Sequence, residues 1–310
     1  MTIKVQFSAL TERWDQYEAP LRKAFADLGL DVDLRIEFPP EQVDYMVYAP
    51  NSSVSDFRPY VNCKAVLNLW AGVDQVVGNP TLDKPLTRMV DYGLSQGMVE
   101  WVTGHVLRHH LGIDKYLSGQ DGEWRLGAPP MSRDRSVVLF GFGALGRACG
   151  EALDALDFKV SGWSNSPKEH DTISTFYGKD GFARALGIAE IAVLLLPATP
   201  DTENMFDTAA FAQMPKDAVI INPGRGTLIN DTDLIASLDA GHLCHATLDV
   251  FRIEPLPADD PFWSHPKVTV TPHIASETRA STAAEVIAEN IRRGEAGEPF
   301  LHVVDMDKGY

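Results

Sequence analysis

The chain has 310 residues, of which 45% are hydrophobic and 9% aromatic, and its formal net charge is −16 at pH 7. This composition is typical of a globular protein, and the length leaves room for two domains with full cores. The negative charge, with an isoelectric point near 4.9, argues against nucleic acid or an anionic membrane as the partner.

Two further features concern the compartment. Three widely spaced cysteines, with no C-x-x-C pair, indicate buried thiols in a reducing environment rather than disulfides or a zinc site. The first residues contain no cationic segment followed by an apolar run, so we expect no signal peptide, and no apolar stretch is long enough to span a membrane. We therefore expect a cytoplasmic protein.

Residues 1–97 alternate between strand and helix patterns. Apolar runs predict strands at 3–7, 32–36, 45–48 and 65–69, and an amphipathic helix at 14–28. This alternation predicts a small parallel sheet with helical crossovers. The turn that follows, Trp70 to Asp74, would lie at the carboxyl end of the sheet, where open α/β folds bind ligands. A plain strand-to-helix turn explains these residues equally well.

A long helix is predicted at 98–117, where the chain would leave the first domain for the second. His105 and His109 have metal-ligand spacing on it, but no Glu stands beside His105 and no third ligand is evident. A packing or interface helix is therefore favoured over a zinc site. Residues 118–135, rich in Gly, Pro and charge, are predicted to form a surface loop.

A dinucleotide-binding pattern follows. A buried strand at 137–140 runs into G-F-G-A-L-G, then into a helix at 145–156 and a second strand at 158–163. Gly141 would form the tight turn, Gly143 would let the backbone approach a pyrophosphate, and Gly146 would allow close helix–strand packing. Ala144 and Leu145 would contribute to the anion-binding helix start. A glycine-rich turn that binds nothing is the alternative.

The end of the second strand bears on which dinucleotide binds. An NAD site usually has Asp or Glu there, whereas this chain has polar residues and one cation: Ser164, Asn165, Ser166 and Lys168. These side chains can donate hydrogen bonds to a 2′-phosphate, and no carboxylate is present to repel it, so they favour NADP(H). The usual phosphate-binding Arg is missing, and NAD(H) is possible. A polar turn indifferent to the phosphate is the alternative.

The alternation then resumes, with strands predicted at 191–195, 218–221, 245–250 and 268–270 and a helix at 231–238. Pro197 lies in a rigid loop after the first of these strands and is placed with the cofactor-binding residues. A final helix at 281–293 is expected to pack back on the first domain.

Three ionisable side chains follow successive strands of this half: Arg225, Glu254 and His273. The carboxyl ends of parallel strands meet at one edge, beside the cofactor crevice. Arg225 could clamp the carboxylate of a 2-oxo acid, His273 could protonate the developing alkoxide, and Glu254 could orient the imidazole. Each residue alone has an ordinary structural explanation, but their convergence favours a site. Asp249 could accept a bond from the nicotinamide amide or could simply order a loop.

Several motifs together resemble the D-isomer-specific 2-hydroxyacid dehydrogenases, and the glyoxylate/hydroxypyruvate reductase A branch in particular. They are G-F-G-A-L-G at 141–146, N-P-G-R-G at 222–226, L-D-V-F at 248–251, E-P-L-P at 254–257, T-P-H-I-A at 271–275, L-W-A-G-V-D at 69–74 and G-W-S-N-S-P-K at 162–168. The resemblance covers essentially the whole chain in the family's order.

The resemblance implies two doubly wound parallel-sheet α/β domains with a cleft between them: a flavodoxin-like substrate domain, 1–97 plus 281–310, and a Rossmann nucleotide domain, 98–280. It also implies Arg225 as substrate clamp, Glu254 and His273 as the acid–base pair, a homodimer built through the nucleotide domains, and a carboxylate held by the backbone N–H groups of Ala71, Gly72 and Val73. Branch members that prefer NADPH commonly have Arg at the position of Asn165.

The leading hypothesis is an NADPH-preferring reductase of a small 2-oxo acid such as glyoxylate or hydroxypyruvate. Trp70 and Tyr48 would line a small side-chain pocket, or would equally well be ordinary core residues. The alternatives are a dehydrogenase of another small anion, such as formate or phosphite, and a non-catalytic protein that senses the dinucleotide.

Overall fold

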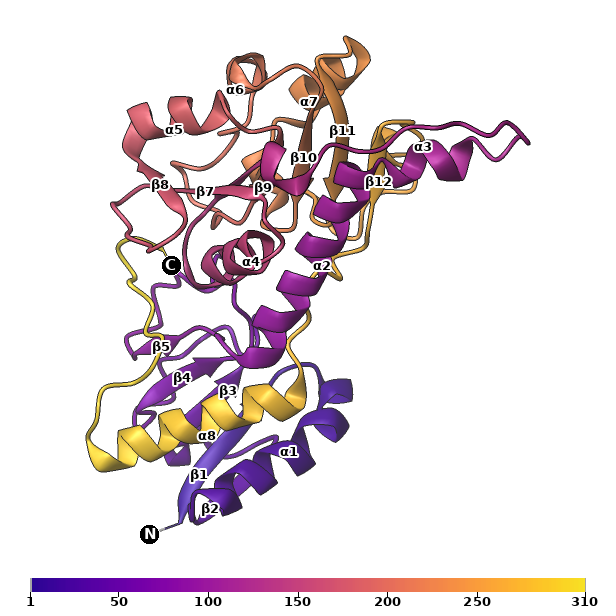
Figure 1. Cartoon of the computed structure of the whole chain (residues 1–310). Helices are drawn as coiled ribbons and strands as arrows, with labels where there is room; N and C mark the ends of the chain where they lie inside the picture. The colour runs from indigo at the N-terminus through magenta and orange to yellow at the C-terminus, as the bar shows by residue number, and fades with distance from the viewer. Residues whose placement is uncertain (1, 310) are drawn as a thin grey trace. The chain divides into compact units, whose positions relative to one another are not determined.

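The computed structural model describes residues 2–309 and divides the chain into two compact units (Figure 1). The first unit consists of the residues up to Leu94 and those from Glu277 onward, and the second of Ser95–Ser276. Each unit is built on its own parallel sheet.

The sheet of the first unit has the strand order β2-β1-β3-β4-β5, with every neighbouring pair parallel. The order matches that of flavodoxin-like folds. The elements of this unit are β1 (Ile3–Ser8), η1 (Thr11–Arg13), α1 (Trp14–Asp27), β2 (Val32–Arg35), η2 (Pro40–Gln42), β3 (Tyr45–Tyr48), β4 (Ala65–Asn68), β5 (Leu86–Thr87) and α8 (Ala280–Ala296).

Two helices from opposite ends of the chain pack together against this sheet, as Figure 1 shows. Leu21 and Phe25 of α1 and Ile287 and Ile291 of α8 lie in one buried apolar cluster with residues of β1, β3 and β4. The prediction that the last helix packs on the first domain is confirmed.

The second unit contains a seven-stranded parallel sheet in the order β12-β11-β10-β9-β6-β7-β8. Numbered within the unit this is 3-2-1-4-5-6-7, the Rossmann order with one additional strand. Its elements are α2 (Tyr92–Leu111, which begins in the first unit), α3 (Ile113–Ser118), η3 (Ser132–Asp134), β6 (Ser136–Phe140), α4 (Ala144–Asp154), β7 (Lys159–Ser164), β8 (Ser174–Tyr177), α5 (Gly178–Leu186), β9 (Ile191–Leu194), α6 (Thr208–Gln213), β10 (Ala218–Asn222), η4 (Gly226–Leu228), α7 (Asp231–Asp239), β11 (Leu243–Leu248), η5 (Pro261–Trp263) and β12 (Val268–Val270).

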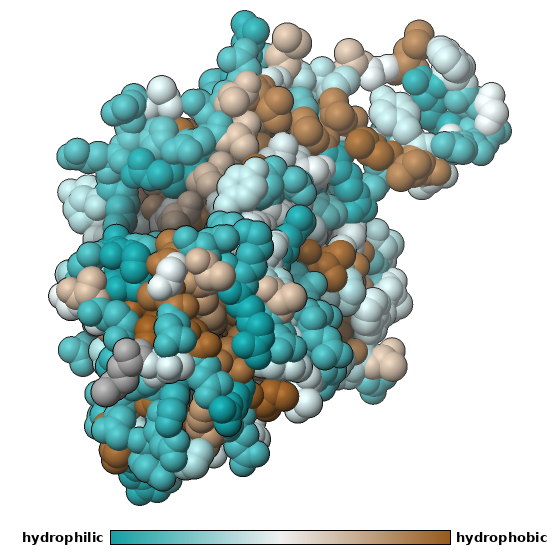
Figure 2. All heavy atoms as spheres, turned by 90° about the horizontal axis from the view of Figure 1, so that it is seen from below, coloured by the Kyte–Doolittle hydropathy of each residue, from teal (hydrophilic) through white to brown (hydrophobic). Residues whose placement is uncertain are grey.

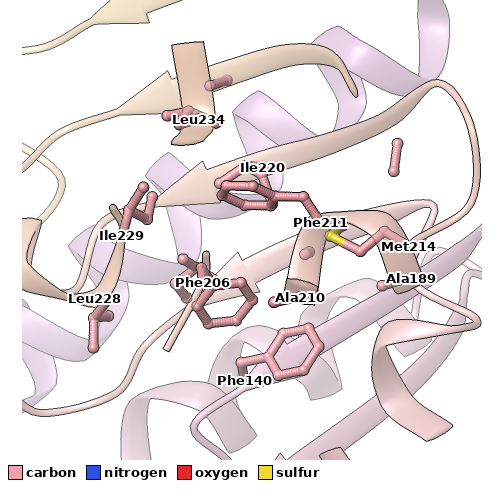
Figure 3. Packing of buried hydrophobic residues seen from close by; sticks show 14 of the residues in the cluster. Phe140, Ala189, Phe206, Ala210, Phe211, Met214, Ile220, Leu228, Ile229 and Leu234 are labelled. Carbon is pink, nitrogen blue, oxygen red and sulfur yellow. The ribbon is translucent and has the colours of Figure 1, made fainter. Parts of the chain in front are cut away.

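Alternate residues of the central strands supply two separate cores, one on each face of this sheet. Val138 and Phe140 of β6 belong to the cluster that α5, α6 and α7 cover, whose packing Figure 3 shows around Phe140, Phe206 and Phe211. Val137 and Leu139 face the other way, toward α2 and α4. Helices on both faces of a parallel sheet confirm the predicted doubly wound fold.

Several predicted elements differ from the structure at their ends, among them one helix and one strand. The helix expected at 98–117 begins six residues earlier, as α2, and is interrupted at Gly112, whose φ of +65° ends one helix before α3 begins. The strand expected at 245–250 is β11, Leu243–Leu248, so Asp249 lies in the loop after it. The short strands β5 and β8 were not predicted.

The histidines of α2 take part in packing. His109 Nε2 lies 2.8 Å from Thr247 Oγ1, and its ring lies 5.0 Å from that of His245 on β11. His245 Nε2 lies 2.8 Å from Thr269 Oγ1, and the ring of His105 lies on that of Trp101, with 4.3 Å between centroids. Within residues 2–309, no group of three or more His, Cys, Asp or Glu side chains could hold a metal ion. None of the helices in that range could cross a membrane.

This histidine pair predicts that the protein loses stability in mild acid. Burial, followed by the charge of Arg108, lowers the pKa of His245 to about 4, and burial, followed by His245, lowers that of His109 to about 3. The unfolded chain binds these protons near pH 6.5, so the free energy of unfolding falls as the pH drops from about 6.5 toward 4.

The variant His245→Gln keeps a side chain that can bond Thr269 but removes one titrating group. Its free energy of unfolding, measured by urea denaturation at several pH values, should fall less steeply with acid than that of the parent, with the neutral-pH values as the internal reference. Curves of equal slope would contradict the assignment.

Candidate active site

The turn between β6 and α4 requires glycine at two positions for steric reasons. Gly141 has φ +110°, and a Cβ added there would lie 2.5 Å from the carbonyl oxygen of Leu195. A Cβ at Gly146 would lie 1.9 Å from the carbonyl oxygen of Gly141. At Gly143 an added Cβ would meet nothing within 4 Å. Protein packing therefore does not require glycine at 143, whereas close approach of a bound group would.

The first turn of α4 can receive an anion. Gly143 is its N-cap residue and supplies no side-chain cap bond, and the first turn contains no acidic residue. Gly143 and Ala144 are exposed, and Leu145 is half-buried. Uncapped N–H groups at a helix start, behind an open glycine, fit the pyrophosphate of a dinucleotide.

The turn after β7 exposes its polar residues. Ser164 is buried, and its hydroxyl donates to the carbonyl of Ser166 at 2.7 Å. Asn165, Ser166 and Lys168 are exposed. A residue that the sequence analysis missed also reaches this turn: Arg147 of α4 donates through Nη2 to the carbonyl of Glu169 at 2.9 Å. Its position directly after Gly146 is the sequence signal that could have identified it.

Arg225 stands at the end of the loop that leaves β10. The buried amide of Asn222 shapes this loop, because its Oδ1 accepts from the N–H of Gly224 at 3.1 Å and its Nδ2 donates to the carbonyl of Arg225 at 2.9 Å. Arg225 itself donates through Nη1 to the carbonyl of Gly224 at 2.7 Å. Asn222 belongs to the N-P-G-R-G motif, but its role in positioning the loop was not predicted from the sequence.

Glu254 and His273, nineteen residues apart in the sequence, form a direct pair. His273 Nδ1 lies 2.7 Å from Glu254 Oε2, while Glu254 Oε1 accepts from the N–H of Phe251 at 2.9 Å. The side chain of His273 is 50% exposed and that of Glu254 is 35% exposed. With Nδ1 donating to the carboxylate, the second ring nitrogen, Nε2, is the one that can serve a ligand.

The pair shifts the pKa of both partners. The hydrogen bond that His273 donates to Glu254 is the largest influence on the imidazole and raises its pKa, although burial and the charge of Arg225 oppose the rise. Burial opposes ionisation of Glu254, yet the bonds from His273 and from the N–H of Phe251, together with the charges of His273 and Arg225, hold its pKa below the usual value. The pair therefore favours an imidazolium beside a carboxylate, with the Arg225 charge close enough to act on both.

Asp249 is fully buried and holds the loop that carries His273. Its Oδ1 accepts from Thr271 Oγ1 at 2.5 Å and from the N–H of Ile274 at 2.9 Å, and its Oδ2 accepts from the N–H of Ala275 at 2.8 Å. These bonds give Asp249 the loop-ordering role. A contact with nicotinamide stays a prediction.

Pro197 lies in the loop after β9, where its carbonyl accepts from Thr202 Oγ1 at 2.7 Å. The loop is therefore tied to its own chain a few residues further on. Its contact with a cofactor also stays a prediction.

The first unit contains the other predicted residues. The side-chain amide of Asn68 donates to the carbonyls of Trp70 and Gly72, at 3.0 and 3.2 Å. The N–H groups of Ala71, Gly72 and Val73 donate no hydrogen bond to any residue that the structure describes. In this turn the Asn68 amide bonds two of the carbonyls, while the three N–H groups have no acceptor among the described residues. Such N–H groups can bind a carboxylate.

Trp70 and Tyr48 differ in burial. Trp70 is half-buried and packs against the main core of the first unit. Tyr48 is only 4% exposed, stacks edge-on with Phe57 and donates its hydroxyl to the carbonyl of Val54 at 3.3 Å. Tyr48 is thus a core residue, and a role for its ring in a substrate pocket stays a prediction.

The family model described as D-isomer specific 2-hydroxyacid dehydrogenase, NAD binding domain, matches residues 103–275. The chain belongs to this family. It is also 39% identical, over 255 residues, to a glyoxylate/hydroxypyruvate reductase A of Serratia proteamaculans, a match covering 80% of this chain and 82% of the relative. The resemblance noted from the motifs is confirmed.

Solved structures of this dehydrogenase family match almost the whole chain. One from Xanthobacter autotrophicus, a D-isomer specific 2-hydroxyacid dehydrogenase in complex with NADPH and MES, has 38% identity, a TM-score of 0.92 and 99% coverage of both chains. An NADPH-dependent glyoxylate/hydroxypyruvate reductase from Sinorhizobium meliloti, in complex with NADP and sulfate, has 35% identity, a TM-score of 0.86 and coverage of 100% of this chain and 99% of that one.

The Glu254–His273 pair predicts a titration that can be measured directly. In the variant Glu254→Gln the side chain can still accept from Nδ1 but lacks the negative charge, so the pKa of His273 should fall. Nuclear magnetic resonance of the imidazole protons across a pH series measures the midpoint.

The matched control is Glu151→Gln, because Glu151 pairs with His170 of the same unit at 3.2 Å. This variant should leave the titration of His273 unchanged. An unchanged midpoint in Glu254→Gln would show that the carboxylate does not set the charge of the ring.

Proposed function

We propose that this protein reduces a small 2-oxo acid of the glyoxylate or hydroxypyruvate type to the D-2-hydroxy acid, with NADPH as the preferred cofactor and His273 as the proton donor. The observation that carries the proposal is the Glu254–His273 pair at 2.7 Å, with the charge of Arg225 acting on both side chains. Kinship with glyoxylate/hydroxypyruvate reductases supports the substrate class.

The protein's residues divide the chemistry between them. Bound NADPH would supply the hydride that reduces the carbonyl carbon. Protonated His273 gives its Nε2 proton to the carbonyl oxygen as negative charge develops there, while Nδ1 keeps its proton on Glu254. In the opposite direction the neutral imidazole takes the hydroxyl proton. The carboxylate of Glu254 favours the protonated ring before the step, which suits reduction.

Arg225 and the turn of the first unit would bind the substrate. The guanidinium of Arg225 would hold the carboxylate and polarise the carbonyl oxygen. The unused N–H groups of Ala71, Gly72 and Val73 would hold the substrate carboxylate, with Trp70 limiting its size.

The cofactor residues in this proposal follow the turn geometry. Gly141, Gly143 and Gly146 with Ala144 and Leu145 would hold the pyrophosphate, and Ser164, Asn165, Ser166 and Lys168 would face the ribose phosphate. The absence of Asp and Glu from residues 162–168 favours NADP(H) over NAD(H). The bound NADP and NADPH of two structural relatives support the same preference.

The direct test follows the absorbance of reduced nicotinamide in mixtures of the protein with short 2-oxo acids and either NADPH or NADH. We expect turnover of glyoxylate or hydroxypyruvate with a higher kcat/KM for NADPH. Turnover only of formate or phosphite would assign another small anion, and cofactor binding without any turnover would indicate a dinucleotide sensor.

Variants then test the residue roles. His273→Ala should lower kcat roughly 10²- to 10⁴-fold, the usual contribution of a general acid.

Arg225→Ala should raise KM and lower kcat together, because the clamp acts in both the ground and transition states. Reduction should also decline as the pH rises through the raised pKa of His273, since the proton donor is then lost.

His265→Ala is the matched control, because His265 also bonds a carboxylate, that of Asp239 at 3.2 Å, but belongs to no proposed site. It should retain activity. A mild loss in His273→Ala, similar to that of His265→Ala, would move the acid role to another group.

We also propose that the protein is a cytoplasmic homodimer formed through its second unit. The segment from α3 to residue 131 extends away from the sheet of that unit as an arm (Figure 1), and apolar residues lie along it (Figure 2). Trp124 and Leu126 are 90% and 87% exposed, and Leu117 and Met131 are also exposed. Large apolar side chains in such positions favour contact with a second copy of the chain.

The double variant Trp124→Ser/Leu126→Ser should dissociate the dimer, because it removes apolar area from the contact. Size-exclusion chromatography with light scattering measures the mass. Tyr177→Ser, which changes a residue 58% exposed on the edge strand β8, is the control and should stay dimeric. A parent that is monomeric at high concentration would refute the assembly.

A further inference from the structure

The turn after β7 has too little positive charge of its own for a ribose phosphate. Lys168 is its one cation, and Glu169 follows directly. A phosphate monoester carries close to two negative charges at neutral pH, and the chain as a whole carries −16. A preference for NADPH therefore requires a further cation placed at this turn.

Arg147 is such a cation. It extends from the first turn of α4, and its Nη2 donates to the carbonyl of Glu169 at 2.9 Å. The guanidinium also lies over the ring of Phe142, 5.7 Å from its centroid. The hydrogen bond and the ring contact together fix the charge beside the residues that follow β7.

The support beneath Arg147 is itself packed tightly. Phe142 lies against Gly162 of β7, where an added Cβ would come within 2.3 Å of the ring. The ring of Phe142 also meets that of His170 edge-on, with 5.9 Å between centroids. Glycine at 162 thus makes room for the ring on which the guanidinium rests.

The turn is tied to α4 at a second point. His170 Nδ1 accepts from the N–H groups of Thr172 and Ile173, so that Nε2 is the nitrogen that donates to Glu151 of α4 at 3.2 Å. Arg147 and Glu151 lie four residues apart on one helix and therefore hold the turn from the same face. The position of the turn relative to the guanidinium is preset by the fold.

Arg147 retains donors for a ligand. Within residues 2–309 its side chain makes no hydrogen bond or ion pair other than the bond to Glu169, and its other contact is with the ring of Phe142. A guanidinium has five N–H donors in a planar fork that matches a phosphate. Most of these donors are therefore available to a ligand at the turn, next to the carbonyl of Glu169.

We propose that Arg147 binds the 2′-phosphate of NADPH and supplies the guanidinium that is missing at Asn165. The inference rests on the proposed function, because it assigns the cofactor specificity of that same site. It places the specificity charge on the helix rather than in the turn. The carboxylate of Glu169, which directly follows Lys168, opposes phosphate binding, and Arg147 offsets it.

The test compares ligands that differ only in the phosphate. Calorimetry of the parent and of Arg147→Gln with adenosine 2′,5′-bisphosphate and adenosine 5′-monophosphate measures the contribution of the 2′-phosphate without any turnover. The variant should bind the bisphosphate roughly 10- to 100-fold more weakly, the span expected for a charged hydrogen bond, and the monophosphate unchanged within about twofold. The kcat/KM for NADPH should fall by a similar factor while that for NADH is retained.

A positioning role gives a different result. If Arg147 only held the carbonyl of Glu169, its loss would loosen the turn and weaken both nucleotides equally, and that outcome would overturn the proposal. Arg147→Lys, which keeps the charge without the planar fork, should retain part of the discrimination. Glu169→Gln should strengthen binding of the bisphosphate.

Arg184→Gln is the matched control, because Arg184 of α5 also lies over a ring, that of Phe176, at 5.1 Å. The variant Arg184→Gln should change the affinity for neither nucleotide.

A parent that does not discriminate between the two nucleotides would refute the proposed cofactor preference. A parent that discriminates, with an Arg147→Gln variant that discriminates equally, would refute the Arg147 assignment alone. Discrimination without reduction of any oxo acid would leave Arg147 supported and the proposed reaction refuted.

Discussion

The buried carboxylate of Asp249 is the constraint on which the arrangement of the Glu254–His273 pair depends. The carboxylate accepts hydrogen bonds from one hydroxyl and two backbone N–H groups of residues 271–275. The backbone carbonyl of Asp249 also accepts from the N–H of His273, at 2.8 Å. His273 has φ +53°, a left-handed conformation that non-glycine residues seldom adopt. Such a conformation persists only where the surroundings hold it. The bonds to Asp249 do so, and the ring then meets Glu254.

Local donors let a strongly acidic protein bind the anionic ligands proposed here. The overall charge of −16 would repel both a 2-oxo acid and a dinucleotide phosphate. The second unit counters this locally with Arg225, with an imidazole whose pKa is raised, and with the uncapped start of α4. Each anionic group of the proposed ligands is matched by a donor that a strand or helix end positions, so binding depends on local geometry rather than on net charge.

Much of the fold could be predicted from the sequence, because the apolar runs of the central strands leave few alternatives. The strands at 45–48 and 268–270 agree with β3 and β12 at both ends. Elements with weak patterns could not be found: β5 has two residues, and β8 has no fully buried residue. The break at Gly112 was also missed, since a single glycine within a helical pattern does not reveal whether its φ is positive.

For the candidate site, the sequence identifies side chains that follow strands and misses those that act across the fold. Arg225, Glu254 and His273 follow three successive strands, so topology alone brings them to one edge. Asn68 and Asn222 orient loops through amide bonds that no spacing rule anticipates, and Arg147 reaches Glu169 from a different element. Because a guanidinium on a helix can serve a turn twenty-two residues later, the absence of Arg at Asn165 is weak evidence against phosphate binding. The cations that surround a turn in space, and not only those within it, determine which dinucleotide it favours.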